Sequence, residues 1–469
     1  MRTEASVTVP NEAEQKLGHA PIPRLAASLA LPAVIAQTAN ALYTIVDRLF
    51  ISHIPGTGSL AMTAVGVCFP VALVLSAVAA LIGMGGAPLA SIELGRGNFK
   101  RAERLLGTCT ATLIVASIVL IVVFEVIKEP VLIAFGASPE TLGYASSFIG
   151  TYLLGTLFVQ LALGLNPFVS AQGKAGVAMG ATLIGALSSI GLDPLFIFTL
   201  NLGVRGAAIA NVIAQALSAL WICYFLMSGR SGIRLRPTLI RFDRLLVPAL
   251  ALGLSPFIQQ ITESVINVVF NSSLQHYGGD KYVGAMTIIA SLEQLVFIFS
   301  SGISQGVQPI IGYNYGARNF TRVRKAYHIV FVANVVVTSA ASGICILMPG
   351  TFAALFTSDP TITGIVVRML PLFMCGFGVF GLQNAVQCVF VGIGQAKPSL
   401  FLALWRKIIL LVPLALILPH FLGVTGVFAA EPLSDVTSAL TAVLLFRHVT
   451  RKLIPSENRW RSSASLARL

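Results

Sequence analysis

Two short stretches, GRGNFKR at residues 95–101 and GARNFTR at residues 316–322, are nearly the same sequence 221 positions apart. Further matches keep the same order, with spacings that drift only from 224 to 220: Ala61-Met62-Thr63 with Ala285-Met286-Thr287, Pro32 with Pro256, Pro88 with Pro309, Gly173 with Gly394, and Gly203-Val204 with Gly423-Val424. Ordered matches at an almost constant offset favour an internal duplication over chance agreement between glycine-rich segments. The chain is therefore predicted to consist of two similar halves.

Both halves have the composition of a membrane protein. Of the 469 residues, 56% are hydrophobic and only 10% are charged, and the mean hydropathy is +0.85. A soluble protein has about 25% charged residues. Twelve spanning helices of roughly 20 to 25 residues each would take about 240 to 300 residues, which leaves no room for a soluble catalytic domain. The expected helices are 25–51, 61–93, 104–127, 142–171, 174–197, 204–228, 245–275, 283–315, 322–347, 361–391, 398–421 and 424–447.

The predicted fold is an all-α membrane protein with twelve transmembrane helices in two six-helix lobes. Because six is even, the second lobe starts on the same membrane face as the first, and a pseudo-twofold axis along the membrane normal relates the two. Rocking of the lobes about this axis would expose a central cavity to either face in turn. The expected divisions are an N-terminal tail (1–24), an N-lobe (25–228), a basic linker (229–244), a C-lobe (245–447) and a C-terminal tail (448–469).

The basic residues predict the orientation. One alternating set of loops and tails carries 24 Lys and Arg residues, whereas the other set carries only Lys128, Arg205 and Lys281. Cytoplasmic loops hold the excess of Lys and Arg, so both termini are expected in the cytoplasm. This topology also explains the net charge of +13 without a nucleic-acid partner. The first 24 residues have no apolar core, so no cleavable signal sequence is expected there.

Acidic residues inside apolar helices are the first candidates for function, because charges in the hydrocarbon are costly. Asp47 and Asp193 lie near the outer ends of the first and fifth helices, so they should share one depth in the N-lobe. A pair of carboxylates can share a proton or bind a sodium ion. Alternatively, Asp47 could pair with its neighbour Arg48 or cap a helix end.

Oxygen-bearing side chains near these acids could complete an ion site. Asn40 and Thr44 precede Asp47 by seven and three residues, and Ser189 precedes Asp193 by four, so each lies on the same helical face as its acid. Asn211 is a further candidate; small polar groups also often bond back to their own helix. Pro32 lies fifteen residues before Asp47 and is expected to bend the first helix, either as a static kink or coupled to protonation of that acid.

The second half contains other acids. Glu263 and Glu293 are candidates for the wall of a substrate cavity, and Glu431 and Asp435 are weaker ones. Basic residues are rare at this depth, so such a cavity would attract cations, although each acid could instead be bonded across helices. Four aromatic residues could stack on a flat cationic ligand or serve only in helix packing: Tyr43, Phe158, Phe257 and Phe297.

Motifs for ATP or enzyme chemistry are missing from the sequence. Gly173-Lys174-Ala175 lacks the earlier glycine and the following Ser or Thr of a phosphate-binding loop. Gly376-Phe-Gly378-Val-Phe-Gly381 has a dinucleotide-binding spacing but no strand before it. The protein is therefore predicted not to be an enzyme and to need no cofactor, and an ion gradient remains as its energy source.

Several segments, taken in order, resemble the multidrug and toxic compound extrusion (MATE) family. They are Ile45-Val46-Asp47-Arg48, residues 83–97, Ser170-Ala-Gln-Gly-Lys174, Leu192-Asp193-Pro194, residues 203–211 and residues 305–317. The resemblance covers about residues 20 to 450. It looks closest to the bacterial DinF-like branch and its MepA-like exporters.

The resemblance implies a twelve-helix antiporter that exports varied, often cationic and aromatic compounds in exchange for protons or sodium ions. It places ion-binding carboxylates on Asp47 and Asp193, ligand positions on Asn40, Ser189 and Asn211, and the first-helix bend on Pro32. Ser189 and Asn211 depart from the common family residues, so the coupling ion is not carried over. Glu263 matches an acidic position of the NorM-like branch whose tenth-helix partner is missing here.

The leading hypothesis is a proton- or sodium-coupled multidrug antiporter that works as a monomer, with small drugs or organic cations as substrates and lipid around it. The alternative is a flippase or exporter of a lipid-linked saccharide or specific metabolite. A flippase of that kind should have a cavity rich in Arg and Lys. A membrane enzyme or a passive channel is the third class, with no motif in its favour.

Overall fold

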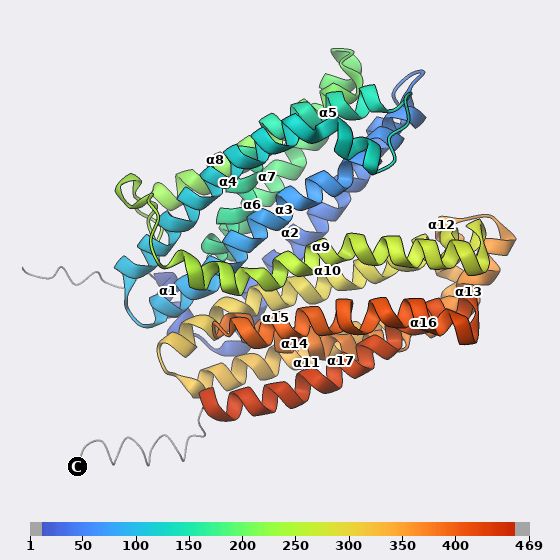
Figure 1. Ribbon diagram of the computed structural model, residues 1–469. Coiled ribbons are helices and arrows are strands. Elements are labelled where there is room, and N and C mark those ends of the chain that lie inside the picture. The colour runs from blue at the N-terminus through green and yellow to red at the C-terminus, as the bar shows by residue number, and fades with distance from the viewer. Residues whose placement is uncertain (1–11, 455–469) are drawn as a thin grey trace, which may run out of the picture.

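The computed structural model describes residues 12–454, and the regular structure in this range is helical throughout (Figure 1). The first half contains α2 (Ile22–Ser52), α3 (Gly58–Gly95), α4 (Phe99–Ala134), α5 (Leu142–Leu154), α6 (Thr156–Ala171), α7 (Ala175–Pro194), the π-helical turn η1 (Leu195–Thr199) and α8 (Gly203–Met227). The second half contains α9 (Leu246–Gly278), α10 (Asp280–Gly316), α11 (Phe320–Leu347), α13 (Pro360–Met374), α14 (Phe377–Gly392), α15 (Ala396–Leu404), the π-helical turn η3 (Trp405–Leu411), α16 (Val412–Leu422) and α17 (Val424–Leu453). Three short helices were not expected: α1 (Glu12–His19), the 3₁₀ turn η2 (Pro237–Leu239) and α12 (Pro349–Phe356).

The all-α, two-lobe membrane fold predicted from the sequence is confirmed. Within residues 12–454, nine helices are long and apolar enough to cross a membrane, and two bent helix pairs bring the number to eleven. The remaining long helix, α9, has 33 residues but carries polar side chains along its middle. Parts of the predicted tails at 1–24 and 448–469 lie outside the described residues, while α2 already begins at Ile22 and α17 extends to Leu453.

The fourth helix of each half is broken, where the sequence had predicted one continuous helix. The axis bends by 57° between α5 and α6 and by 45° between α13 and α14. Gly155 and Gly376 lie at these breaks, 221 positions apart. A Cβ atom on Gly155 would come within 2.4 Å of the Val212 side chain, and one on Gly376 within 2.4 Å of Pro432 Cα. Each break therefore lets a neighbouring helix approach closely.

The turn before α4 is repeated before α11. Asn98 and Asn319 are the N-caps of these helices, and their side chains accept hydrogen bonds from the backbone N–H groups of Arg101 and Arg322. In both turns the residue just before the cap has a positive φ: +74° for Gly97 and +56° for Arg318. The left-handed region is unfavourable for residues with a Cβ atom.

We expect Arg318→Gly to stabilise the protein slightly, because it removes the strain of a side chain at positive φ. The left-handed conformation costs a residue with a Cβ atom about 1–2 kcal/mol, and the gain on its removal is partly offset by the greater freedom of glycine in the unfolded chain. The thermal melting temperature in detergent should rise by a degree or more, and Gly97→Ala, the matched change in the other half, should lower it. A melting temperature that falls for Arg318→Gly would contradict this account.

The two lobes touch at the end of the molecule that carries α1 and the end of α17, and they diverge toward the end that carries α5 and α12 (Figure 1). Glycines make the contact close. A Cβ atom on Gly253 of α9 would lie 1.7 Å from the Leu81 carbonyl oxygen of α3, and one on Gly85 would lie 2.1 Å from the Ala249 carbonyl oxygen. Backbone therefore packs on backbone across the lobe boundary.

Gly253→Ala should separate the lobes at this end. Overpacking of a close contact costs about 1–3 kcal/mol, so we expect a lower melting temperature in detergent for this variant. Gly343→Ala is the matched control, because Gly343 is also helical but a Cβ atom there meets nothing within 4 Å. Equal melting temperatures for the two variants would show that the close contact does not stabilise the observed state.

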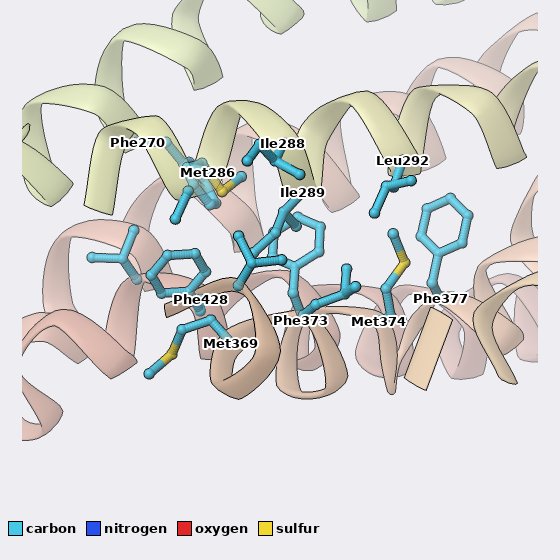
Figure 2. Packing of buried hydrophobic residues seen from close by; sticks show 14 of the residues in the cluster. Phe270, Met286, Ile288, Ile289, Leu292, Met369, Phe373, Met374, Phe377 and Phe428 are labelled. Carbon is cyan, nitrogen blue, oxygen red and sulfur yellow. The ribbon is translucent and has the colours of Figure 1, made fainter. Parts of the chain in front are cut away.

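The C-lobe and the N-lobe each contain an apolar cluster of their own. In the C-lobe, Phe373 and Met374 of α13 point toward Ile289 and Leu292 of α10, as Figure 2 shows. The four side chains are almost fully buried. A further cluster joins the start of α2 to α10, α11 and α14, at the end where the lobes touch. Relative motion of the lobes would therefore leave the first two clusters intact and repack the shared one.

Candidate functional site

Asp47, Asp193 and Asn211 converge in the N-lobe from α2, the end of α7 and α8. Asn211 Nδ2 donates to Asp47 Oδ1 at 3.3 Å, and Ser189 Oγ lies 3.5 Å from Asp193 Oδ2. Asp193 and Ser189 have no exposed surface, and Asp47 and Asn211 are also buried. The expected proximity of the two acids is present, together with Ser189 and Asn211.

The two carboxyl groups lie close enough to interact electrostatically. Two ionised carboxylates held near each other repel, so a proton or a cation on one of them stabilises the pair. The ion pairs of the described residues do not include one with either acid. In addition, Asp193 Oδ1 is buried without a hydrogen-bond partner. The arrangement can therefore take up a proton or a small cation and release it again.

Tyr43 connects this acid pair to a small polar cavity. Its hydroxyl donates to Asn211 Oδ1 at 2.9 Å. The cavity has a volume of about 40 Å³, enough for at least one water molecule. Its polar lining comes from Asn40, Tyr43, Asn166, Thr182, Asn211, Gln215 and Ser218. Polar groups thus continue from the acids into the lobe.

The other expected neighbours form no hydrogen bond or ion pair with the two acids within residues 12–454. Thr44 donates back to the Asn40 carbonyl oxygen of its own helix at 2.9 Å, and the Asn40 side chain is exposed and lines the polar cavity. Arg48 lies over the Phe69 ring at 5.8 Å and forms no ion pair with Asp47 in the described part of the chain. Pro32 lies inside α2, which continues through it from Ile22 to Ser52.

Sequence reasoning missed Tyr152 and the far side of the polar cavity. Tyr152 of α5 is close enough to Asp47 and Tyr43 to interact electrostatically with both. Asn166, Thr182 and Gln215 line the cavity from α6, α7 and α8. A polar side chain inside an apolar helix was the available signal, but that signal is shared by many residues that bond only to their own backbone.

A second charged cluster lies in the C-lobe around Arg406 and Lys407 on the π-helical turn η3. Arg406 donates from Nη2 to Glu431 Oε1 at 2.7 Å and from Nε to Asp435 Oδ1 at 2.8 Å, and its guanidinium lies 4.3 Å from the centre of the Phe380 ring. All three charged groups of this triad are buried. Charges at this depth are stable when they are paired.

Lys407 forms an ion pair with Glu263, whose side chain is half exposed. Glu293 lies close enough to interact with Arg406, Glu263 and Asp435, and is partly buried. The acids expected to line a cation-attracting cavity are thus partly compensated by two basic residues. Four acids share this cluster with Arg406 and Lys407, so the surplus charge is negative when all of them are ionised.

The expected aromatic residues do not form one cage. Phe297 is 41% exposed and its ring lies 6.0 Å from that of Phe380. Phe158 and Phe257 are half-buried in α6 and α9, and the Tyr43 hydroxyl donates a hydrogen bond to Asn211. Of the four, Phe297 is the one adjacent to the charged cluster, through Phe380 and Arg406.

The sequence reasoning also missed a polar network in the core of the C-lobe. Asn384 Nδ2 donates to Ser300 Oγ at 2.7 Å and to Ser304 Oγ at 3.3 Å, and the Asn334 side chain bonds to the same two hydroxyls. These bonds join α10, α11 and α14. They satisfy one another, so the network holds the three helices together.

A helical membrane protein with two similar lobes, joined at one end and carrying buried acids in each, has the architecture of a transporter. A family model described as MatE matches residues 32–195 and 256–417, once in each half. The chain belongs to this family, the multidrug and toxic compound extrusion transporters, and it is a multi-pass membrane transporter and not an enzyme.

Curated relatives of similar length agree with this assignment. Multidrug export protein MepA of Staphylococcus haemolyticus (strain JCSC1435) is 25% identical over 436 residues, which cover 90% of this chain and 93% of that protein. The protein of the same name from Staphylococcus aureus (strain NCTC 8325 / PS 47) is 25% identical over 424 residues, which cover 88% and 91%.

Solved structures of the family share the fold. A crystal structure of MATE in the bent conformation has a TM-score of 0.89 at 24% identity and covers 95% of this chain and 99% of that one. An outward-facing conformation of a multidrug resistance MATE family transporter has a TM-score of 0.85 at 24% identity, with the same coverage.

Proposed function

We propose that this protein is a cation-coupled antiporter that exports small organic compounds, many of them cationic and aromatic, with the proton as the favoured coupling ion. The observation that carries the proposal is the proximity of Asp47 and Asp193, two buried carboxyl groups that form no ion pair within residues 12–454. Such a pair exchanges a proton readily, since it cannot stay doubly ionised at low cost. The MepA relatives, named as multidrug export proteins, support the substrate class.

In the proposed coupling, the proton and the substrate favour different arrangements of the two lobes. Loading the acid pair removes a buried charge and changes the hydrogen bond from Asn211 to Asp47, which joins α8 to α2. A change of helix packing in one lobe can then bias how the lobes meet. Pro32 in α2 is proposed as the position where the first helix bends in response.

The proposed substrate surface lies between the lobes, at the end where they diverge. Glu263, Glu293 and Phe297 would provide it in the C-lobe, and Tyr43, Phe158 and Phe257 would contribute from neighbouring helices. Asn40, Thr44, Ser189 and Asn211 would serve the ion pathway. Sodium at Asp47 and Asp193 is the competing coupling ion, since carboxylate, amide and hydroxyl oxygens are also its ligands.

The proposed topology places both termini in the cytoplasm of a bacterial inner membrane. The divisions are the N-lobe at 25–228, the linker at 229–244, the C-lobe at 245–447, and tails at 1–24 and 448–469. With this orientation the lobes diverge toward the outside, an outward-open state. One chain holds both lobes, so a monomer would suffice.

The proposal is tested by efflux of a fluorescent cationic dye from proteoliposomes under an imposed proton gradient, sodium gradient or neither. We expect efflux to follow the proton gradient and to collapse when a protonophore is added. Efflux that follows only the sodium gradient would identify sodium, and not the proton, as the coupling ion. Efflux that follows neither gradient would exclude the proposed antiport and favour a flippase of lipid-linked saccharides.

A further inference from the structure

A basic groove lies between the start of α2 and the start of α11, at the end of the molecule where the lobes touch. Its volume is about 580 Å³. We call it the α2–α11 groove; it is lined by Pro21, Ile22, Pro23, Arg322, Arg324, Lys325, His328 and Ile329. The first three residues belong to the first half of the chain and the other five to the second half.

The groove has a basic side and an apolar side. Three of the lining residues are Arg or Lys, a fourth is His, and none is acidic. Arg322 is held in place by bonds from its guanidinium to Asn314 Oδ1 and to the carbonyl oxygens of Leu17 and Ala20. The Lys325 and His328 side chains are exposed. An anion in the groove would therefore meet one guanidinium held in place, with an exposed lysine and histidine beside it.

The corresponding place in the first half is closed and neutralised. Glu103 stands 221 positions before Arg324 and forms an ion pair with Arg236 of the linker at 3.0 Å. The linker packs there: a Cβ atom on Gly107 would lie 2.2 Å from the Leu239 carbonyl oxygen. Within residues 12–454, the α2–α11 groove therefore remains open, whereas its counterpart is covered by the linker.

Two exposed apolar stripes run from the groove along the helices that form it. On α11, His328 is followed at intervals of four by Val332 and Val336, which are 59% and 57% exposed. On α2, Leu31 and Ile35 are 62% and 41% exposed. Both helices have the length and hydropathy to cross a membrane, so these stripes lie at hydrocarbon depth. A ligand that fills the groove and follows the stripes has an anionic head and apolar chains.

From this arrangement we infer that the α2–α11 groove binds the phosphate head group of an anionic phospholipid, with its acyl chains along the exposed faces of α2 and α11. Basic pockets between membrane helices are typical sites for such head groups. Each Lys or Arg near the surface adds about 1 kcal/mol, which is about a fivefold change in affinity. Because both halves of the chain line the groove, the bound lipid stabilises the state in which the lobes touch at this end.

The experiment uses the full chain purified in mild detergent, without any transport assay. Melting temperature and native mass spectrometry are recorded with added phosphatidylglycerol, phosphatidylcholine or inorganic phosphate. The wild-type protein should bind phosphatidylglycerol and melt at a higher temperature with it than with phosphatidylcholine or phosphate. Lys325→Gln should weaken that binding about fivefold and Arg324→Gln/Lys325→Gln about 25-fold.

The matched control is Arg104→Gln. Arg104 is the exposed residue of α4 that stands 221 positions before Lys325, at the covered counterpart. It should bind phosphatidylglycerol as the wild type does. If the double variant already melts at a lower temperature than the wild type without lipid, the lipid affinity of the single Lys325→Gln variant is used instead. The inference is overturned if phosphatidylcholine or inorganic phosphate stabilises the protein equally, or if Arg104→Gln weakens binding as much as Lys325→Gln.

Discussion

Asp193→Asn is expected to abolish gradient-driven dye efflux from proteoliposomes while the protein stays folded. Asn keeps the size of the side chain and its bond with Ser189, but it cannot take up or release a proton. Coupling free energies between sites are about 1–3 kcal/mol, so the gradient-dependent part of the flux should fall on the order of 100-fold. Asp47→Asn should have the same effect, because the proton is shared by the pair.

The control is Asp280→Asn. Asp280 is an exposed residue at the start of α10, far along the chain from the acid pair, and its carboxylate accepts a hydrogen bond from Gln275. This variant should transport as the wild type does. Gradient-driven efflux that survives in both Asp47→Asn and Asp193→Asn would remove the N-lobe pair from the mechanism.

Arg406→Ala is expected to cause the largest loss of stability of any single substitution considered. The change leaves Glu431 and Asp435 buried without the guanidinium that pairs with both. Removing one partner from a buried ion pair typically costs about 3–5 kcal/mol. The melting temperature in detergent should fall by several degrees, and expression in the membrane should decrease.

A triple variant separates charge from packing. In Arg406→Ala/Glu431→Gln/Asp435→Asn, the two acids that bond to Arg406 are replaced by neutral side chains of the same size, so neither is left as an unpaired charge. We expect the triple variant to recover most of the lost stability, with a residual deficit from the lost contact between Arg406 and Phe380. A triple variant that is no more stable than Arg406→Ala would show that packing of the guanidinium, and not charge compensation, is its main contribution.

Much of the fold could be predicted from the sequence, because hydropathy and repeat spacing are local properties of the chain. The two-lobe division follows from matches such as Asn98 with Asn319. The breaks at Gly155 and Gly376 could not be predicted in this way. A glycine inside an apolar run permits a bend but does not require one; the close approach of Val212 or Pro432 decides it.

The proximity of the N-lobe acids could be predicted because both lie near the same ends of parallel helices. The hydrogen-bond partners around them could not be predicted in the same way. The bond from Tyr43 to Asn211 joins residues 168 positions apart and depends on how α2 and α8 rotate toward each other. Helical periodicity gives the face of one helix but not its partner, which is why Thr44, on the expected face, turns back to its own helix.

The C-lobe shows the limit of counting charges. The sequence indicated an acidic interior with few basic residues, and both basic residues of the cluster were visible in it. Their pairing was not, because Lys407 and Glu263 are 144 positions apart and meet only when α9 packs against η3. Net charge at a given depth therefore overestimates the field that a substrate would meet.

The paired breaks at Gly155 and Gly376 also bear on the origin of the chain. Two halves that now differ at most positions bend at the same place, so the bend is older than the duplication that produced them. With α9 and the two bent pairs counted, each half has six long helical segments, so both halves would start on the same side of the membrane. Fusion of two copies of a chain of about half this length, placed side by side in the same orientation, would produce this arrangement and would leave each copy free to evolve its own charged cluster.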